Sequence, residues 1–184
     1  MERHRATEYL VLRQTIAQRG SLRPVLVLSG LACWALALIA VLAFLPYPVA
    51  AAIPLLVLLA TFETIRPLHF GAERIGRYLQ VFYEADGDPN RPMRDTPSWE
   101  RVAMSFGAIP GIGGHPLFVP LFLIAALLNY LAVLLPRPVT LELIVMGIPH
   151  LAFVAWMLAA DRAMRSQRAS ELARFQELYR GGHN

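Results

Sequence analysis

The sequence predicts an all-α integral membrane protein, in which four transmembrane helices form two hairpins and amphipathic helices lie on the cytoplasmic side. Three observations predict this class. The chain of 184 residues is 56% apolar and only 16% charged, whereas soluble domains are roughly 45–50% apolar and about 25% charged. Four apolar runs are long enough to cross a bilayer. The connection between the first two runs and the connection between the last two are short and repeat one motif framed by prolines.

The four apolar runs are 25–45, 48–65, 116–135 and 139–160. Each is close to the length of about 20 residues that a transmembrane helix needs. We expect residues 25–65 to form the first hairpin and residues 116–160 to form the second.

The connection inside each hairpin reads Leu-Pro-x-Pro-Val, as "LPYPV" at 45–49 and as "LPRPV" at 135–139. Proline ends one helix and begins the next, because its nitrogen carries no hydrogen and its φ angle fits a first helical turn. We therefore interpret both motifs as hairpin tips. The two halves match poorly outside these turns, so we favour convergent turn chemistry over an internal repeat.

Arginine predicts the orientation of the helices in the membrane. All 17 basic residues are arginine, which is compatible with a GC-rich bacterial genome, and only Arg137 lies at a hairpin tip. The others flank the hairpins on the opposite side, and short loops rich in basic residues stay in the cytoplasm. We expect a protein of the bacterial plasma (inner) membrane with both termini and the segment between the hairpins in the cytoplasm.

Three segments make up the expected cytoplasmic part. Residues 1–24 carry an amphipathic helix that we expect to end at Gly20. Residues 66–115 contain a helix over 72–84 that continues from the second transmembrane helix, followed by a proline-rich break and a short interfacial helix. Residues 161–184 extend the fourth transmembrane helix.

The helix over 72–84 has two faces at helical spacing. We expect its polar face, with Glu73, Arg74 and Arg77, to lie opposite the packed side. Its aromatic face favours contact with a partner, because aromatic side chains anchor protein interfaces. The residues that we assign to partner contact are Tyr78, Phe82, Tyr83, Trp99 and Phe106.

Polar side chains inside transmembrane helices are costly and often functional. Counting from the outer turn at about 1.5 Å per residue, His150 lies roughly 16 Å deep, near the centre of the bilayer. Thr61 and Glu63 lie within its reach by the same count, whereas Asn129 lies too near the outer surface. We therefore expect a neutral His150 that hydrogen-bonds Thr61 or Glu63 and clasps the hairpins together.

Cofactor binding is a second interpretation of the histidines. His69, His115 and His150 are candidates to ligate a heme iron or a chlorophyll magnesium. We favour the clasp, because a single histidine in a helix bundle is more often a packing residue. Neither a cofactor nor a metal is therefore expected.

Enzymatic chemistry is not indicated. The single cysteine, Cys33, excludes sites built on paired cysteines within the chain, and no catalytic set of nucleophile, histidine and carboxylate is recognisable. The "DGDPN" segment at 86–90 begins like a calcium loop but lacks the later ligands. Acidic residues on the cytoplasmic side offset the arginines, so nucleic-acid binding is not expected.

We therefore expect a non-enzymatic membrane subunit that acts by helix–helix contact, either as a homo-oligomer or as an accessory or scaffold subunit of a larger membrane complex. The arginines near the membrane also suit anionic lipid headgroups. Two alternatives stay open. One is an oligomeric channel or pore, and the other is a heme- or chlorophyll-binding subunit of an electron-transfer or light-harvesting complex.

Overall fold

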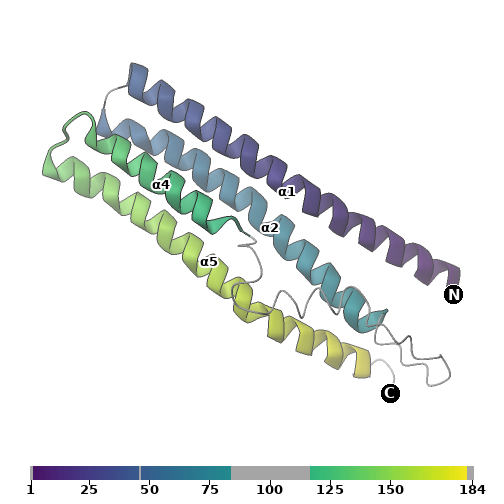
Figure 1. Cartoon of the computed structure of the whole chain (residues 1–184). Coiled ribbons are helices and arrows are strands. Elements are labelled where there is room, and N and C mark those ends of the chain that lie inside the picture. The colour runs from purple at the N-terminus through teal and green to yellow at the C-terminus, as the bar shows by residue number, and fades with distance from the viewer. Residues whose placement is uncertain (1, 46, 84–116, 182–184) are drawn as a thin grey trace. The chain divides into compact units, whose positions relative to one another are not determined.

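The computed structural model of the chain describes residues 2–45, 47–83 and 117–181, and over these residues it is all-helical (Figure 1). This agrees with the predicted all-α class. The elements, in chain order, are α1 (Glu2–Phe44), the 3₁₀ helix η1 (Pro48–Ala51), α2 (Ala52–Phe82), α4 (Val119–Leu134) and α5 (Thr140–Gly181).

The chain divides into two units, and α1, α2 and α5 each contribute to both. The described residues of 22–67 and 115–163 form the first unit, which we call the apolar half. Those of 1–21, 68–114 and 164–184 form the second, which we call the polar half. Three helices, α1, α2 and α5, are long and apolar enough to cross a membrane, and α4 is a shorter apolar helix. The fold is therefore that of a multi-pass membrane protein.

The long helices contain prolines and glycines, residue types that often end a helix. The prediction that the N-terminal helix ends at Gly20 is wrong, because α1 continues through Gly20 and Pro24 to Phe44. Gly20 does not adopt the positive φ angle with which glycine usually terminates a helix. In the same way α2 runs through Pro67 and α5 through Pro149. A proline thus lies inside each of the three long helices.

In the apolar half, α1 packs through a narrow face. Val27, Trp34 and Val41 are buried and recur every seventh residue, the spacing of one helix face. Gly30 lies on the same face and against Thr61 of α2. A Cβ atom placed on Gly30 would lie 2.2 Å from Cγ2 of Thr61, so no larger residue fits without movement.

The other helices of the apolar half pack around Phe62 of α2. Its ring meets the ring of Phe122 on α4 at 5.5 Å and that of Phe153 on α5 at 6.3 Å, both edge to face. Such arrangements are favourable for aromatic pairs. All three rings are buried, so this cluster forms the centre of the apolar half.

The turn that follows α4 carries backbone strain. Arg137 has a φ angle of 55°, and its backbone N–H donates to the carbonyl of Leu134 at 3.2 Å. The helix then restarts at Thr140, where the backbone N–H of Val139 donates to the side chain of Glu142 at 3.0 Å. The start of α4 also differs from the expected residue 116, since the helix begins at Val119 after Phe118, whose φ angle is 53°.

Candidate functional site

A buried hydrogen-bond network in the apolar half is centred on Asn129, whose exposed fraction is 0%. Its Oδ1 accepts from Nε1 of Trp34 at 3.2 Å. Its Nδ2 donates to the carbonyl of Ala51 at 3.0 Å and lies 2.9 Å from Nε2 of His150. The network therefore joins α1, η1, α4 and α5 through one amide.

The chemistry of the partners determines the protonation state of His150. The indole N–H of Trp34 is only a donor and the carbonyl of Ala51 is only an acceptor, which together orient the Asn129 amide. Its Nδ2 must therefore donate to Nε2 of His150, and that nitrogen carries no proton. The other ring nitrogen, Nδ1, donates to the carbonyl of Met146 at 2.7 Å. His150 is thus neutral, and both of its ring nitrogens are engaged.

The expected partners of His150 were wrong. Thr61 donates instead to the carbonyl of Val57 at 2.7 Å within its own helix. Glu63 binds Arg66 and Trp156. A depth count from the turns assumes that all helices end at one level, whereas α5 extends further toward the turn than α4 (Figure 1). That offset brings Asn129, which the count had placed too near the outer surface, level with His150.

The predicted clasp residue Glu63 belongs to a second group, at the other end of the apolar half. Its Oε1 accepts from Nε1 of Trp156 on α5 at 2.6 Å, and its Oε2 lies 2.8 Å from Nη2 of Arg66. The guanidinium of Arg66 also lies over the Trp156 ring, with its Cζ 5.2 Å from a ring centroid. This partly exposed group ties α2 to α5. Tryptophan and arginine are the side chains that favour a membrane–water interface.

Two carboxylates hold α2 and α5 together in the polar half. Glu73 pairs with Arg168 at 2.5 Å and with Arg77 at 3.2 Å. Glu171 pairs with Arg77 at 2.5 Å and with Arg74 at 2.9 Å. Arg77 is only 3% exposed and bridges both carboxylates. The expectation that Arg77 lies on the outer face is wrong, because α5 covers that face with its own charged residues.

The ion pairs change the acidity of both carboxyls. Burial alone would raise the pKa of Glu73, but hydrogen bonds and charge interactions with His69 and Arg168 lower it from 4.5 to about 2. Burial would also raise the pKa of Glu171, but hydrogen bonds and charge interactions with Arg74 and Arg77 outweigh this effect and lower its pKa. Both groups are therefore charged at neutral pH, and their charges are compensated within the chain.

The aromatic residues that we assigned to partner contact also pack within the polar half. Tyr78 stacks on Phe82 at 4.7 Å, and Phe82 meets Phe175 of α5 at 6.4 Å. Tyr83 meets Tyr9 of α1 at 5.6 Å. These half-buried rings join α1, α2 and α5. Whether their exposed parts also contact a partner stays a prediction, and Trp99 and Phe106 lie outside the described residues.

The candidate cofactor ligands are not brought together. His150 lies in the apolar half with both ring nitrogens engaged. His69 is buried in the polar half, where its Nε2 lies 3.1 Å from Oε1 of Glu73. His115 lies outside the described residues. Within residues 2–45, 47–83 and 117–181, no group of three or more histidine, cysteine, aspartate or glutamate side chains is arranged to hold a metal ion.

The chain is thus a helical, multi-pass membrane protein. A hydrogen-bond network joins the helices of its apolar half, and ion pairs join those of its polar half. Comparisons of the chain with protein-family models, with curated proteins and with solved structures find no match.

Proposed function

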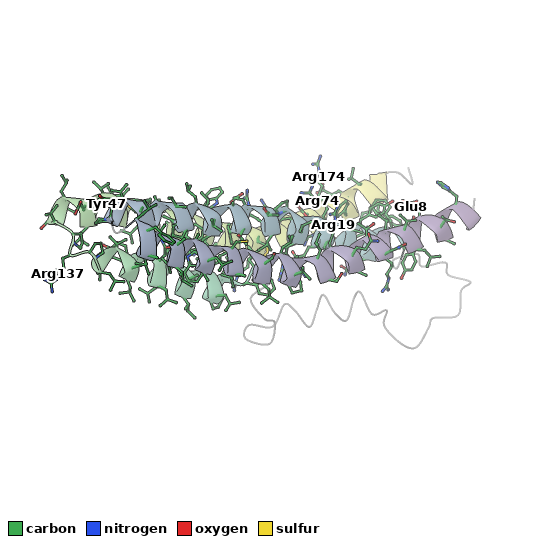
Figure 2. The ribbon with its side chains drawn as sticks, turned by 90° about the horizontal axis from the view of Figure 1, so that it is seen from above. Glu8, Arg19, Tyr47, Arg74, Arg137 and Arg174 are labelled. Carbon is green, nitrogen blue, oxygen red and sulfur yellow. The ribbon has the colours of Figure 1, made fainter. Side chains whose placement is uncertain are left out.

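We propose that the protein spans the bacterial plasma membrane four times, as two hairpins, with both termini and the polar half in the cytoplasm. The distribution of arginine supports this orientation. Figure 2 shows Tyr47 and Arg137 at the turn end of the apolar half, whereas Glu8, Arg19, Arg74 and Arg174 belong to the polar half. With 16 residues, α4 is about 24 Å long, so it crosses only with apolar flanking residues or a locally thinner bilayer.

Cysteine labelling tests this orientation. In a Cys33→Ala background, a cysteine at Tyr47 should react with a membrane-impermeant reagent added to intact cells. A cysteine at Gln176, which is exposed on α5, should react only after lysis. Labelling of the Gln176→Cys variant in intact cells would overturn the topology.

We further propose that the protein acts by helix–helix contact, as a self-associating or accessory subunit, and not as an enzyme. The observation that supports this most is the uncovered face of α1. Of the apolar stretch of α1 only 11% is buried, against 39% in α2 and 28% in α5. The face opposite Val27 and Trp34 is exposed throughout and carries Val25, Leu28, Ala32, Leu36 and Ile39.

The composition of this face is suited to a helix neighbour. Ser29, Cys33 and Ala40 lie between its larger residues and are exposed. Small residues let two helix backbones approach closely, and membrane helices associate through such surfaces. A second copy of the chain and a different membrane protein could both use this face.

Oxidative crosslinking of Cys33 in native membranes tests self-association. A membrane-soluble oxidant should convert the wild-type chain to a disulfide-linked dimer. The control is Leu151→Cys in the Cys33→Ala background. Both positions lie in the apolar part of a long helix, and both are exposed.

The Leu151 control should stay monomeric, because α5 is more extensively covered than α1. Equal crosslinking from both positions would show random collision and would remove the support for a specific α1 contact. If neither position crosslinks, self-association through α1 is excluded and only the accessory role remains.

The two alternatives receive less support. Ligation of a heme or chlorophyll by His150 would require breaking its bond to Asn129. A pore would need a continuous stripe of polar groups that face water. Trp34 and His150 instead form hydrogen bonds with Asn129 in the interior of the apolar half.

A further inference from the structure

An open cavity lies at the turn end of the apolar half, where both Leu-Pro-x-Pro turns contribute to its wall. It has a volume of about 230 Å³. Val41 and Leu42 of α1 and Leu45 of the first turn line it, together with Ala132 of α4 and Leu135 and Pro136 of the second turn. Its side chains are apolar apart from the hydroxyl group of Tyr47, which is 70% exposed.

A charged residue follows the wall of this cavity directly in the chain. Arg137 comes next after Leu135 and Pro136, and its guanidinium makes no hydrogen bond or ion pair with any residue that the structure describes. The carboxylate nearest to it in sequence, Glu142, is engaged by the backbone N–H of Val139. Figure 2 shows the Arg137 side chain extending outward from this end of the apolar half.

The backbone at Arg137 is strained, and no hydrogen bond or ion pair of its side chain with a described residue accounts for arginine at this position. Its φ angle of 55° is a conformation that glycine adopts freely and that other residues adopt at a cost. The turn after α4 would therefore form more easily with glycine. Arginine at this position supplies a positive charge next in the chain to Leu135 and Pro136 of the cavity wall, and no residue that the structure describes pairs with it.

We propose that this cavity holds the headgroup-proximal part of one acyl chain of an anionic phospholipid whose phosphate pairs with Arg137. The cavity lies at the level of the last turns of α1 and α4. In the orientation proposed above, on which this inference rests, the first methylene groups of a lipid lie at this level under its headgroup. A guanidinium binds phosphate with two parallel hydrogen bonds. The apolar wall suits the acyl chain of such a lipid, and the guanidinium suits its phosphate. The charge therefore favours an anionic headgroup, and the cavity has room for a single chain.

Native mass spectrometry of the intact protein tests the proposal. The protein is purified in mild detergent and equilibrated with equal amounts of phosphatidylglycerol and phosphatidylcholine of the same chain composition. The wild type should retain phosphatidylglycerol about fivefold more than phosphatidylcholine, the preference expected from one basic residue at a membrane surface.

Two variants separate the headgroup from the chain. Arg137→Gly relieves the strain and should abolish the preference while the protein stays folded. Ala132→Leu fills the cavity and should lower the retention of both lipids. Arg180→Gly removes an exposed arginine of the polar half and serves as the charge control, so it should behave as the wild type.

A preference for phosphatidylglycerol that survives Arg137→Gly would overturn the assignment of the cation. Unchanged retention in Ala132→Leu would overturn the assignment of the cavity. If added oleate replaces phosphatidylglycerol, the occupant is a free fatty acid and the phospholipid assignment is wrong. Should Ala132→Leu fail to fold, the Arg137→Gly result decides on its own.

Discussion

Nδ2 of Asn129 donates to Nε2 of His150 at 2.9 Å, and this bond links α4 to α5 in the interior of the apolar half. The same amide binds Trp34 of α1 and Ala51 of η1. One fully buried side chain thus satisfies polar groups from three other elements. A network of this kind specifies one packing arrangement, because any other leaves several polar groups unpaired.

We predict that Asn129→Leu is more destabilising than His150→Leu. Loss of Asn129 removes the partner of three polar atoms, Nε1 of Trp34, the carbonyl oxygen of Ala51 and Nε2 of His150, at a cost of about 1–3 kcal/mol per unsatisfied group. Loss of His150 leaves Asn129 bonded to Trp34 and Ala51 and only one of its N–H groups without an acceptor, so this variant should lose less stability. Thermal unfolding in one detergent measures both variants. Equal effects would contradict the central role of Asn129.

We predict that Gly30→Ala loosens the contact of α1 with α2. The new Cβ would overlap Cγ2 and Oγ1 of Thr61, so the Thr61 side chain or one of the two helices must move. Overpacking of this kind costs about 1–3 kcal/mol. The control is Gly147→Ala, whose Cβ would lie 3.5 Å from the hydroxyl group of Tyr130, an ordinary contact.

The stability of the two variants in detergent decides this prediction. Adding Thr61→Ala to Gly30→Ala should restore part of the loss, because it removes Cγ2 and Oγ1 but keeps Cβ. If Gly147→Ala is as destabilising as Gly30→Ala, helix propensity and not the close contact is responsible.

Gly20→Ala should stabilise the protein. Gly20 lies inside α1, and no atom lies within 4 Å of the position that a Cβ would occupy. Alanine therefore adds no clash and reduces the conformational entropy of the unfolded chain. The expected gain is about 0.5–1 kcal/mol in the free energy of unfolding. A loss of stability would contradict this prediction and would show that Gly20 requires a backbone conformation other than the helical one in α1.

Acid should destabilise the ion-pair cluster of the polar half. The pKa of Glu73 is lowered to about 2 in the folded protein from 4.5, so its stabilising contribution is complete above about pH 4.5. It is lost as the pH falls toward about 2, because the unfolded chain then binds the proton first. Glu73→Gln should reduce this pH dependence, and the remainder should come largely from Glu171.

Unfolding followed from pH 7 to pH 2 measures this effect. The control is Glu177→Gln on α5, which removes an exposed carboxylate without a hydrogen bond among the described residues. Its pH dependence should match that of the wild type. A pH profile of Glu73→Gln that coincides with that of Glu177→Gln would contradict the assigned pairing.

The pattern of apolar residues was sufficient to predict the helices. The four runs became α1, α2, α4 and α5, and the helices predicted to continue beyond the second and fourth runs do so in α2 and α5. This succeeded because a run of about 20 apolar residues has few other stable structures. Single residues were less informative, as Gly20 shows, since a glycine ends a helix only when its backbone turns left-handed.

Which side chains meet depends on how the helices pack against one another. The partner of His150 depends on the axial offset between α4 and α5, and a shift of a single helical turn, about 5.4 Å, exchanges one partner for another. The burial of Arg77 depends on α5 covering a face that the sequence of α2 alone marks as polar. The class of protein and the positions of its apolar helices could be predicted from the sequence, because both follow from local composition. The polar network and the ion pairs were set by the relative positions of distant segments, which no local pattern encodes.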